Sequence, residues 1–421
     1  MELAIRAAML HVGASFLEQL LSSDTGYVGP RVDCGAGHQA EFVSVREKGF
    51  GTALGRARLP RAYYYCSDCH AGVVPRDEQL GLAGTSLSPG LRAMADRVGA
   101  AVPFAKGATL LSELAGVDLG AKAIERVAES DGQALSGIAS AEAAGVAAGS
   151  LVLLGPAEAP RKLYIVMDGT GVPMVASCTA GRPGKSPDGR AATREAKLAV
   201  LFTQSRLDAE GYAVRDESSS TYVGTFEPAE GFALLVQAEA MRRGVTSAGS
   251  VVVLGDGAPW IWAIADDYFP EATQVVDLYH ARQHLHGLGA LVAPALGGTS
   301  APWLKDRLDE LDAGQVGALA TAVRELALPG ELACEAEKAL GYFETNVERM
   351  RYAEFRALGH FVGSGTVEAG CKSVIAQRLK LSGMRWRVSP GATGIMTLRC
   401  EETSGRWDEI CQRLRTQTRV A

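Results

Sequence analysis

The first 25 residues of the chain place apolar side chains at helical spacing. The positions concerned are Leu3, Ala7, Leu10, Ala14, Leu17, Leu20 and Leu21. Because apolar residues three or four positions apart form one face of an α-helix, we predict an N-terminal helix within residues 1–30. A polar run at residues 22–26 marks its end.

Residues 31–75 follow a different pattern. Short alternating segments such as Glu41–Val45, and the aromatic run Tyr63–Tyr65, favour β-strands over helices. We therefore predict a small β-rich module in this range. A module of this size buries little apolar surface, so its fold needs a further source of stability.

Helical patterning returns over residues 76–150. Ser88-Pro89 predicts a helix start, because proline is favoured at the first helical position. Farther on, one helix is expected to end at Gly116, and a second one carries Lys122, Glu125 and Arg126. Helix-turn-helix DNA-binding units have this form. Any two packed helices joined at a glycine give the same pattern, so both interpretations stay open.

Strands and helices alternate beyond a linker at residues 155–160. Leu163–Met167 and Val251–Leu254 are apolar runs of strand length, and each leads into an aspartate, Asp168 or Asp256. We expect Val172–Val175 to fold back on the first of these strands across Gly169-Thr170-Gly171. Further strands are predicted at residues 197–203 and 274–277, and helices at 228–243 and from 278 through 286. This alternation indicates an α/β class.

The α/β pattern is interrupted once. Residues 161–286 form its first part, residues 287–358 show only helical spacing and read as a helical insertion, and residues 359–421 form its last part with a basic C-terminal segment. The charge distribution supports a special role for that segment. From Arg349 to the end there are 13 Lys or Arg and 6 Asp or Glu, so this stretch carries +7 although the whole chain carries −6. Such asymmetry indicates a bound polyanion, or else a solvated basic face.

Composition sets broad limits. The chain has 421 residues, of which 47% are hydrophobic and 21% charged, which predicts a packed multidomain protein. No apolar window approaches the length of about 18 residues that a membrane span needs, and the N-terminus lacks the pattern of a secretory signal. We therefore expect a cytoplasmic protein with no membrane partner.

Three carboxylates stand out as candidates for chemistry. Asp168 and Asp256 follow apolar strands and precede glycines, at strand ends where α/β proteins bind ligands. Glu368 lies in the first turn of a helix that Ser364 or Thr366 can cap. Each residue alone has a structural interpretation as a turn or helix-end residue. Together they suit a pair of divalent ions for phosphoryl transfer on DNA, with Mg²⁺ or Mn²⁺ as the cofactor.

The cysteines indicate a second metal. Of eight cysteines, only Cys66 and Cys69 are closely spaced, as in half of a zinc ribbon. Cys34 and His38 supply a less regular second half, with His70 as the competitor to His38. We predict a structural Zn²⁺ held by Cys34, His38, Cys66 and Cys69. Reduced cysteines without any metal are the alternative.

Three runs of the chain, Tyr164–Pro173, Gly255–Trp262 and Gly363–Glu368, resemble the ISKra group of bacterial insertion-sequence transposases. That group is similar to the Mutator-type DDE transposases. The resemblance covers nearly the whole chain and includes Pro75–Glu78 and Ser88–Leu91. Several motifs in the same order are more specific than any one of them.

The resemblance implies an RNase H-like catalytic core with a helical insertion before the last carboxylate. It implies that Asp168, Asp256 and Glu368 are the catalytic triad. It also matches Asp277–His280 to the Asp-x-x-His signature of Mutator-type enzymes. There, His280 would bind a phosphate or position a metal ligand, and a role in the protein core is the alternative. The same resemblance implies a homodimer or larger assembly, in a bacterial cytoplasm and associated with the nucleoid.

The predicted function is that of a DNA transposase. The zinc module and the helices after it would bind double-stranded DNA at the terminal inverted repeats, and the core would cut a phosphodiester and join the new end to target DNA. The candidate phosphate contacts are Lys197, Lys372, Arg378, Lys380, Arg385 and Arg387. Two alternatives remain: an RNase H-like nuclease or resolvase that does not join DNA, and a catalytically inactive DNA-binding protein derived from a transposase.

Overall fold

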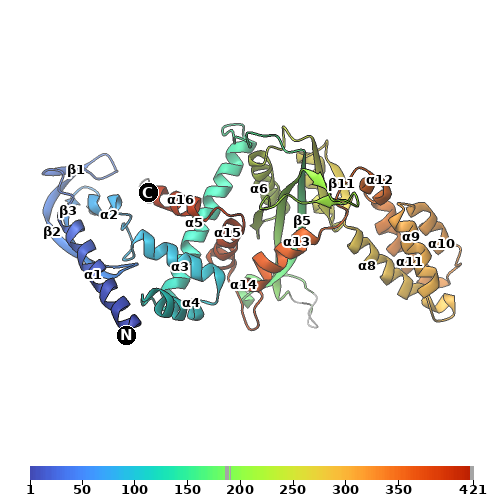
Figure 1. Ribbon diagram of the computed structural model, residues 1–421, viewed down its shortest axis with the longest axis horizontal. Helices are drawn as coiled ribbons and strands as arrows, with labels where there is room; N and C mark the ends of the chain where they lie inside the picture. Colours follow the sequence, from blue (N-terminus) through green and yellow to red (C-terminus); the bar gives the residue numbers. More distant parts are fainter. Residues whose placement is uncertain (185–188, 190, 418–421) are drawn as a thin grey trace. The chain divides into compact units, whose positions relative to one another are not determined.

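The chain forms two compact units (Figure 1). The structure is a computed structural model that describes residues 1–184, 189 and 191–417. Unit 1 combines Met1–Gly137 with Arg387–Ala421, and unit 2 is Ile138–Trp386. The C-terminal stretch 359–421 is therefore divided, because its residues from Arg387 onward pack with the N-terminal part of the chain. Among the described residues, no helix has the length and apolarity needed to cross a membrane.

Unit 1 begins with a helix and a β-rich module, as the sequence predicts, and the module is a four-stranded antiparallel sheet. The elements are α1 (Glu2–Ser22), β1 (Arg31–Asp33), β2 (Gln39–Thr52), β3 (Gly55–Cys66) and β4 (Ala71–Val73), and the strand order is β1-β2-β3-β4. Helix α1 packs against β3. Leu21 at the end of α1 joins Phe50, Leu59 and Leu82 in a small core.

The rest of unit 1 is helical. Its elements are α2 (Pro75–Gln79), α3 (Pro89–Ala101), α4 (Phe104–Leu110), η1 (Leu111–Ala115), the part of α5 (Ala121–Ala147) up to Gly137, and the C-terminal η6 (Val388–Ala392), α15 (Thr393–Thr403) and α16 (Trp407–Gln417). Ser88 caps α3 by accepting a hydrogen bond from the Leu91 amide, as Ser-Pro predicts. Gly116 ends the α4–η1 run in the left-handed conformation, so the predicted break between two helices is present.

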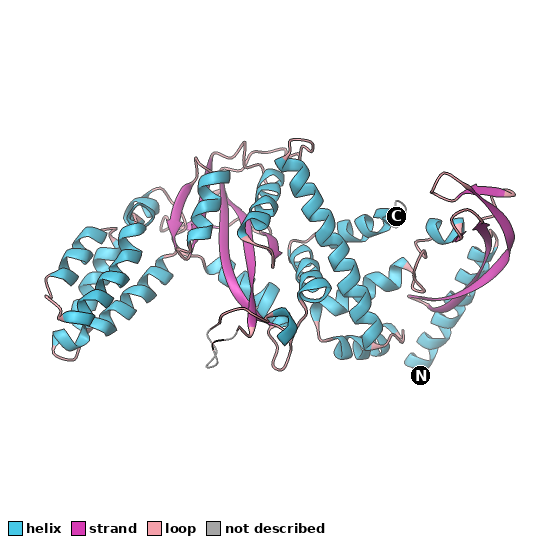
Figure 2. Cartoon of the chain, turned by 180° about the vertical axis from the view of Figure 1, so that it is seen from behind, coloured by secondary structure: helices cyan, strands magenta, loops and turns pink. Residues whose placement is uncertain are grey.

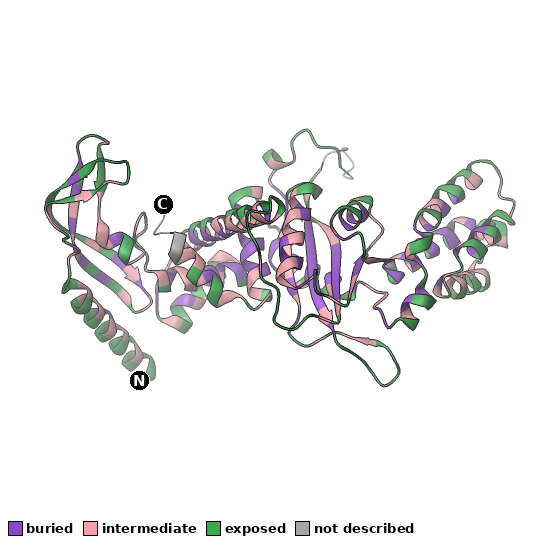
Figure 3. Ribbon diagram, turned by 90° about the horizontal axis from the view of Figure 1, so that it is seen from above, coloured by how far each residue is buried: buried purple, intermediate pink, exposed green. Residues whose placement is uncertain are grey.

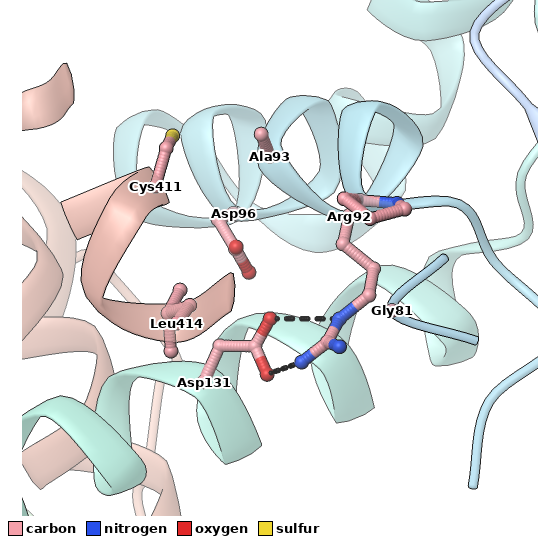
Figure 4. Close-up of a pocket in the computed structure, with 8 residues that line it drawn as sticks. Gly81, Arg92, Ala93, Asp96, Asp131, Cys411 and Leu414 are labelled. Carbon is pink, nitrogen blue, oxygen red and sulfur yellow. Dashed lines mark hydrogen bonds and ion pairs between the residues drawn. The ribbon is translucent and has the colours of Figure 1, made fainter. Parts of the chain in front are cut away.

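A buried polar cluster lies between three helices of unit 1 (Figure 4). Arg92 of α3 forms a two-pronged ion pair with Asp131 of α5, in which Nε lies 3.1 Å from Oδ2. Asp96, one turn along α3, is buried beside Asp131. With Cys411 and Leu414 of α16 these residues line a cavity of about 30 Å³. Burial, followed by the charge of Asp131, raises the pKa of Asp96 well above its usual range.

Unit 2 is built on a mixed five-stranded sheet (Figure 2). Its strands are β5 (Lys162–Pro173), β6 (Thr193–Gln204), β9 (Thr221–Thr225), β10 (Ser250–Gly255) and β11 (Thr273–Val276). Their order is β11-β10-β5-β6-β9. Strands β5, β6 and β9 are antiparallel in succession, whereas β10 runs parallel to both β5 and β11. A short hairpin, β7 (Arg206–Leu207) with β8 (Ala213–Val214), lies outside this sheet.

The predicted turn after Asp168 is wrong. Strand β5 continues without a break through Asp168, Gly169 and Gly171 to Pro173, and its antiparallel partner is β6 rather than residues 172–175. Both glycines are strand residues rather than turn residues. A Cβ atom at Gly169 would lie 2.5 Å from Oε1 of Glu195 on the neighbouring strand. Asp168 therefore lies in the middle of a long strand, opposite Leu198.

Helices cover both faces of this sheet, and its central strands are buried (Figure 3). Helix α13 (Gly365–Gly370), which continues through η5 (Cys371–Ala376) into α14 (Gln377–Leu379), packs on β5 and β6. Gly370 approaches Leu198 and Val200, which defines one face. Lys197 points to the other face, where its ammonium group lies over the ring of Trp260 in α7 (Pro259–Tyr268). Helix α6 (Ala229–Arg242) packs against α7.

Residues 287–358 contain helices and no strand, as their spacing predicts. They continue α8 (Leu278–Val292) with η3 (Ala293–Leu296), α9 (Ala301–Asp312), α10 (Val316–Arg324), α11 (Gly330–Thr345), η4 (Val347–Arg349) and α12 (Tyr352–Ala357). Helix α8 packs against α9 and α11. One further short element of unit 2, η2 (Ala176–Cys178), follows β5. Helix α8 thus links the end of β11 to the insertion.

Candidate metal centres

Four sulfur and nitrogen donors meet at one end of the N-terminal sheet. Cys34 and His38 come from the turn between β1 and β2, whereas Cys66 ends β3 and Cys69 lies in the turn between β3 and β4. The ligand atoms of all four residues lie within 4.8 Å of one another. The Sγ atom of Cys69 is 3.0 Å from that of Cys66 and 3.3 Å from that of Cys34, and 3.7 Å from Nδ1 of His38.

This group can hold a zinc ion. Three thiols and one imidazole form a closed four-ligand set of the kind found in structural zinc sites. With Zn–S bonds of about 2.3 Å, the edges of such a tetrahedron measure about 3.8 Å, so a small outward movement of the sulfurs makes room for the ion. The backbone N–H of Ala36 is the main cause that lowers the pKa of Cys34 to about 7, which favours the thiolate that binds metals.

The competing histidine lies elsewhere. His70 has its Nδ1 atom 3.2 Å from the hydroxyl of Tyr65 and adopts a left-handed backbone conformation, with φ of 52°. His38, not His70, therefore completes the cluster. The small core beside it contains Ala40, Ala62 and Tyr64, so few apolar residues stabilise this end of the sheet.

Several basic residues of the zinc module are engaged within the protein. Lys48 and Arg61 both form ion pairs with the buried Asp77, at 3.0 and 2.6 Å. The guanidinium of Arg46 lies 3.5 Å from the centre of the Tyr63 ring. Arg56 and Arg58 are exposed, and Arg58 is 3.7 Å from Glu47. The exposed arginines are thus the ones placed to meet an anionic partner.

The first two carboxylates of the predicted triad come together in unit 2. The parallel ladder pairs Leu254 of β10 with Val166 of β5, so Asp256 follows its strand at the level of Asp168. Asp168 points to the sheet face that α13 covers, because Leu198, its partner on β6, faces Gly370 there. The carboxylate of Asp256 accepts a hydrogen bond from the Ala258 amide at 2.9 Å, which fixes it at the loop after β10.

The helix that carries Glu368 reaches the same place. The thiol of Cys371 donates a hydrogen bond to Oδ2 of Asp168 at 3.4 Å. Glu368 precedes Cys371 by three residues, a spacing that puts both side chains on one side of the helix. The chain switches from α-helix to π-helix at Cys371, and such irregular turns are frequent at functional sites. The sequence missed this contact, although the spacing from Glu368 could have signalled it.

The electrostatics of this site fit a cation. Burial is the main cause that raises the pKa of Asp168, and the nearby charge of Asp256 adds to it, whereas the Cys371 thiol and His280 act in the opposite direction. His280 is therefore near enough to Asp168 for its charge to act on that carboxylate. A divalent ion would relieve the repulsion between the two carboxylates.

A tyrosine from the insertion holds the loop of Asp256. The hydroxyl of Tyr342 in α11 donates a hydrogen bond to the backbone carbonyl of Asp256 at 3.0 Å. Its ring covers Gly257, whose φ of 102° and whose missing Cβ, which would lie 2.7 Å from the ring, both require glycine. The ring of His284 in α8 stacks on the ring of Tyr342, with ring centres 3.8 Å apart. Nothing in the sequence pattern alone connects Tyr342 with Asp256.

The three carboxylates are less tightly grouped than the sulfur site. Among the residues that the structure describes, only the Cys34 group brings three or more metal-binding side chains within 4.8 Å of one another. A two-ion site does not require such contact. With ions about 4 Å apart and bonds of about 2.1 Å, carboxylate oxygens on different ions can be about 8 Å apart. The oxygen donors present therefore suit Mg²⁺ or Mn²⁺.

The predicted phosphate contacts differ in position. Lys197 and Arg378 are buried, with exposed fractions of 8% and 0%. Lys197 forms an ion pair with Glu195 at 2.9 Å, and Arg378 lies over the ring of Trp386. Neither side chain reaches a DNA backbone from this position. Lys380 donates a hydrogen bond to the hydroxyl of Thr170, which lies two residues beyond Asp168 on the same face of β5. The remaining three predicted phosphate contacts, Lys372, Arg385 and Arg387, are exposed.

Comparison with known proteins does not identify a relative from which the function of this site could be inferred. No protein-family model matches the chain, and no curated protein matches it.

Proposed function

We propose that the chain is a DNA transposase whose RNase H-like core cuts and joins DNA with two divalent cations. The observation that carries the proposal is the meeting of Asp168, Asp256 and the Glu368 helix on one side of one sheet. These residues are about 200 positions apart at the extremes, so a local turn motif does not account for their convergence. Three converging carboxylates without a cation would repel one another, whereas a metal pair uses all of them.

The strand order is a second support. Three successive antiparallel strands, β5, β6 and β9, followed by β10 and β11 parallel to β5, form the arrangement expected of an RNase H-like core. The helical insertion lies between β11 and the helix of Glu368, where the resemblance to insertion-sequence transposases implies it. This argument is one of fold analogy, so the function depends on the site rather than on the sheet.

The bound cations would activate the attacking oxygen and stabilise the leaving one. Asp168 and Asp256 would hold them from adjacent strands, and Glu368 from the helix across the sheet. Lys372, 78% exposed and 4.0 Å from Glu368, would meet a DNA phosphate beside the metals. The zinc module, with its exposed arginines, and the helices near Gly116 would bind the terminal inverted repeats in a homodimer or larger assembly.

The test uses the purified full-length chain and DNA fragments that flank its own coding sequence, where the element ends would lie. We expect Mg²⁺- or Mn²⁺-dependent cutting at these ends and joining of pre-cleaved ends to a target plasmid. Cutting without joining would identify a nuclease or resolvase instead. DNA binding without any metal-dependent cutting, unchanged in Asp256→Ala, would identify an inactive DNA-binding protein.

A further inference from the structure

Asp277 is a fully buried carboxylate between β11 and α8, with an exposed fraction of 0%. Its backbone amide donates a hydrogen bond to the carbonyl of Gly255 at 2.7 Å. One side-chain oxygen, Oδ1, accepts from the His280 amide at 2.6 Å, which caps α8. The other oxygen, Oδ2, accepts from the Ser364 amide, 87 residues farther along the chain.

Each of these three partners either belongs to the proposed active site or lies next to one of its elements in the sequence. Gly255 precedes Asp256, and Ser364 precedes the helix of Glu368 by one residue. The third partner is His280 itself. We propose that Asp277 is a positioning residue that sets the distance between Asp256, His280 and Glu368. This inference rests on the proposed function and adds to it the residue that holds the metal ligands in place.

Helix capping alone does not explain why the second side-chain oxygen of Asp277, Oδ2, binds the Ser364 amide. An N-cap needs one acceptor, and Ser or Asn caps a helix as well as Asp does. A buried carboxylate is costly unless its charge is compensated by hydrogen bonds or a counterion. Among the described residues, no Lys or Arg forms an ion pair with Asp277, so the amides of His280 and Ser364 supply that compensation.

Two neighbouring contacts also hold the start of α8 against the loop before α13. The Leu278 amide donates to the carbonyl of Val362 at 2.9 Å, so α8 and the loop before α13 are linked a second time. The ring of Tyr279 packs on Gly363, where an added Cβ would lie 2.8 Å from the ring. The loop that carries Ser364 is thus held against the start of α8 by three contacts, from the Asp277 carboxylate, the Leu278 amide and the Tyr279 ring.

The test separates capping from positioning. Asp277→Ser keeps a hydroxyl that caps α8 but loses the acceptor for Ser364, whereas Asp277→Ala loses both. Asp216→Asn is the matched control, because Asp216 also accepts several hydrogen bonds in unit 2, from Thr203 and Ser205. The first readout is hydrogen exchange of single amides in the full-length chain, which does not depend on activity.

We expect faster exchange at Ser364 in Asp277→Ser, with His280 still protected, and faster exchange at both positions in Asp277→Ala. Loss of a residue behind the metal ligands typically weakens metal affinity about 10–100-fold. Half-maximal cleavage by Asp277→Ser should therefore need at least about tenfold more Mg²⁺, with little change in the KM for DNA. The control should leave both readouts unchanged.

Metal binding is measured separately with Mn²⁺ alone, by electron paramagnetic resonance, so that a failure of the proposed function can be recognised. If the parent binds Mn²⁺ but cuts no DNA, the transposase proposal fails, and weaker Mn²⁺ binding by Asp277→Ser still supports the positioning role. Unchanged Ser364 exchange, or unchanged Mn²⁺ affinity in a folded Asp277→Ser protein, would overturn it. So would a parent chain that binds no Mn²⁺.

Discussion

The sulfur site of unit 1 and the carboxylate site of unit 2 are assembled in different ways. The four Cys and His side chains that could bind zinc come from two neighbouring turns of one small sheet and are already in contact. The three carboxylates come from two strands and a helix that are far apart in sequence, and they are more widely spaced. Neutral thiols and an imidazole tolerate contact without an ion, whereas charged carboxylates repel one another until a cation arrives.

This difference implies different roles for the two metals that we propose. The zinc module has a small core, so an ion there would contribute to folding. The carboxylate site lies on a sheet whose central strands are buried, so we expect this fold to form without a bound ion. Removing the first metal should unfold a region, whereas removing the second should only stop the chemistry.

The largest effect is expected from Cys66→Ser. Structural zinc supplies about 10–16 kcal/mol in small domains, so loss of one thiolate should unfold strands β1 to β4. Elemental analysis should show that the variant loses the single bound zinc, and hydrogen exchange should show lost protection in residues 31–73. Cys334→Ser, which changes an exposed cysteine of unit 2, is the control. Zinc content equal to that of the parent would contradict the assignment.

The next effect concerns Glu368→Gln in the carboxylate site. A metal ligand contributes several kcal/mol to transition-state stabilisation, so cleavage should fall about 10³-fold or more. The thermal transition of unit 2 should stay or rise, because one of the repelling charges is removed. Glu335→Gln, an exposed change in α11, should leave cleavage unchanged. A Glu368→Gln protein that cuts at the parental rate with Mg²⁺ would exclude Glu368 as a ligand.

The sequence predicted local features well. Helix α1, the Ser88-Pro89 helix start, the break at Gly116, the apolar strands and the helical insertion are all present, because spacing and capping signals act over a few residues. The turn proposed after Asp168 failed for the same reason. Glycines at 169 and 171 read locally as a turn, but the segment is held extended by its pairing with β6, which begins 20 residues after β5 ends.

The carboxylate site could be predicted only as a set of residues. Asp168, Asp256 and Glu368 were marked by strand ends and a helix start, but the contacts that hold them depend on tertiary structure. Tyr342 reaches Asp256 across 86 residues and Asp277 reaches Ser364 across 87. Burial is also a property of the fold, which is why Lys197 and Arg378 looked like surface cations in sequence.

A third prediction compares a buried carboxyl group of unit 1 with the carboxylates of the metal site. Asp96 has a raised pKa in the folded state, so the fold binds this proton more tightly than the unfolded chain does. Its contribution to stability is therefore full below the unfolded pKa of about 3.9 and declines as pH rises toward the folded pKa. Asp96→Asn resembles the protonated form and removes this decline.

We expect Asp96→Asn to raise the free energy of unfolding of unit 1 by about 1–3 kcal/mol at pH 8, the usual cost of a poorly compensated buried polar group. The gain should disappear near pH 4. Calorimetry at both pH values measures it, with the exposed Glu113→Gln as a control of the same charge change. A gain that is equal at both pH values would show that Asp96 does not titrate between them.

The smallest effect concerns two lysines of unit 2 that the sequence treated alike. Lys372 is exposed beside Glu368, whereas Lys197 is buried and paired with Glu195 on the opposite face of the sheet. Each phosphate contact contributes about 0.9 to the slope of log affinity for DNA against log salt, so Lys372→Ala should lower the slope by about that amount and weaken binding a few-fold. Lys197→Ala should leave the slope unchanged and lower the thermal stability of unit 2, because it removes the packing of a buried side chain on Trp260 together with its ion pair to Glu195. Equal slopes for Lys372→Ala and the parent would place the DNA away from the carboxylate face, even if the metals bind there.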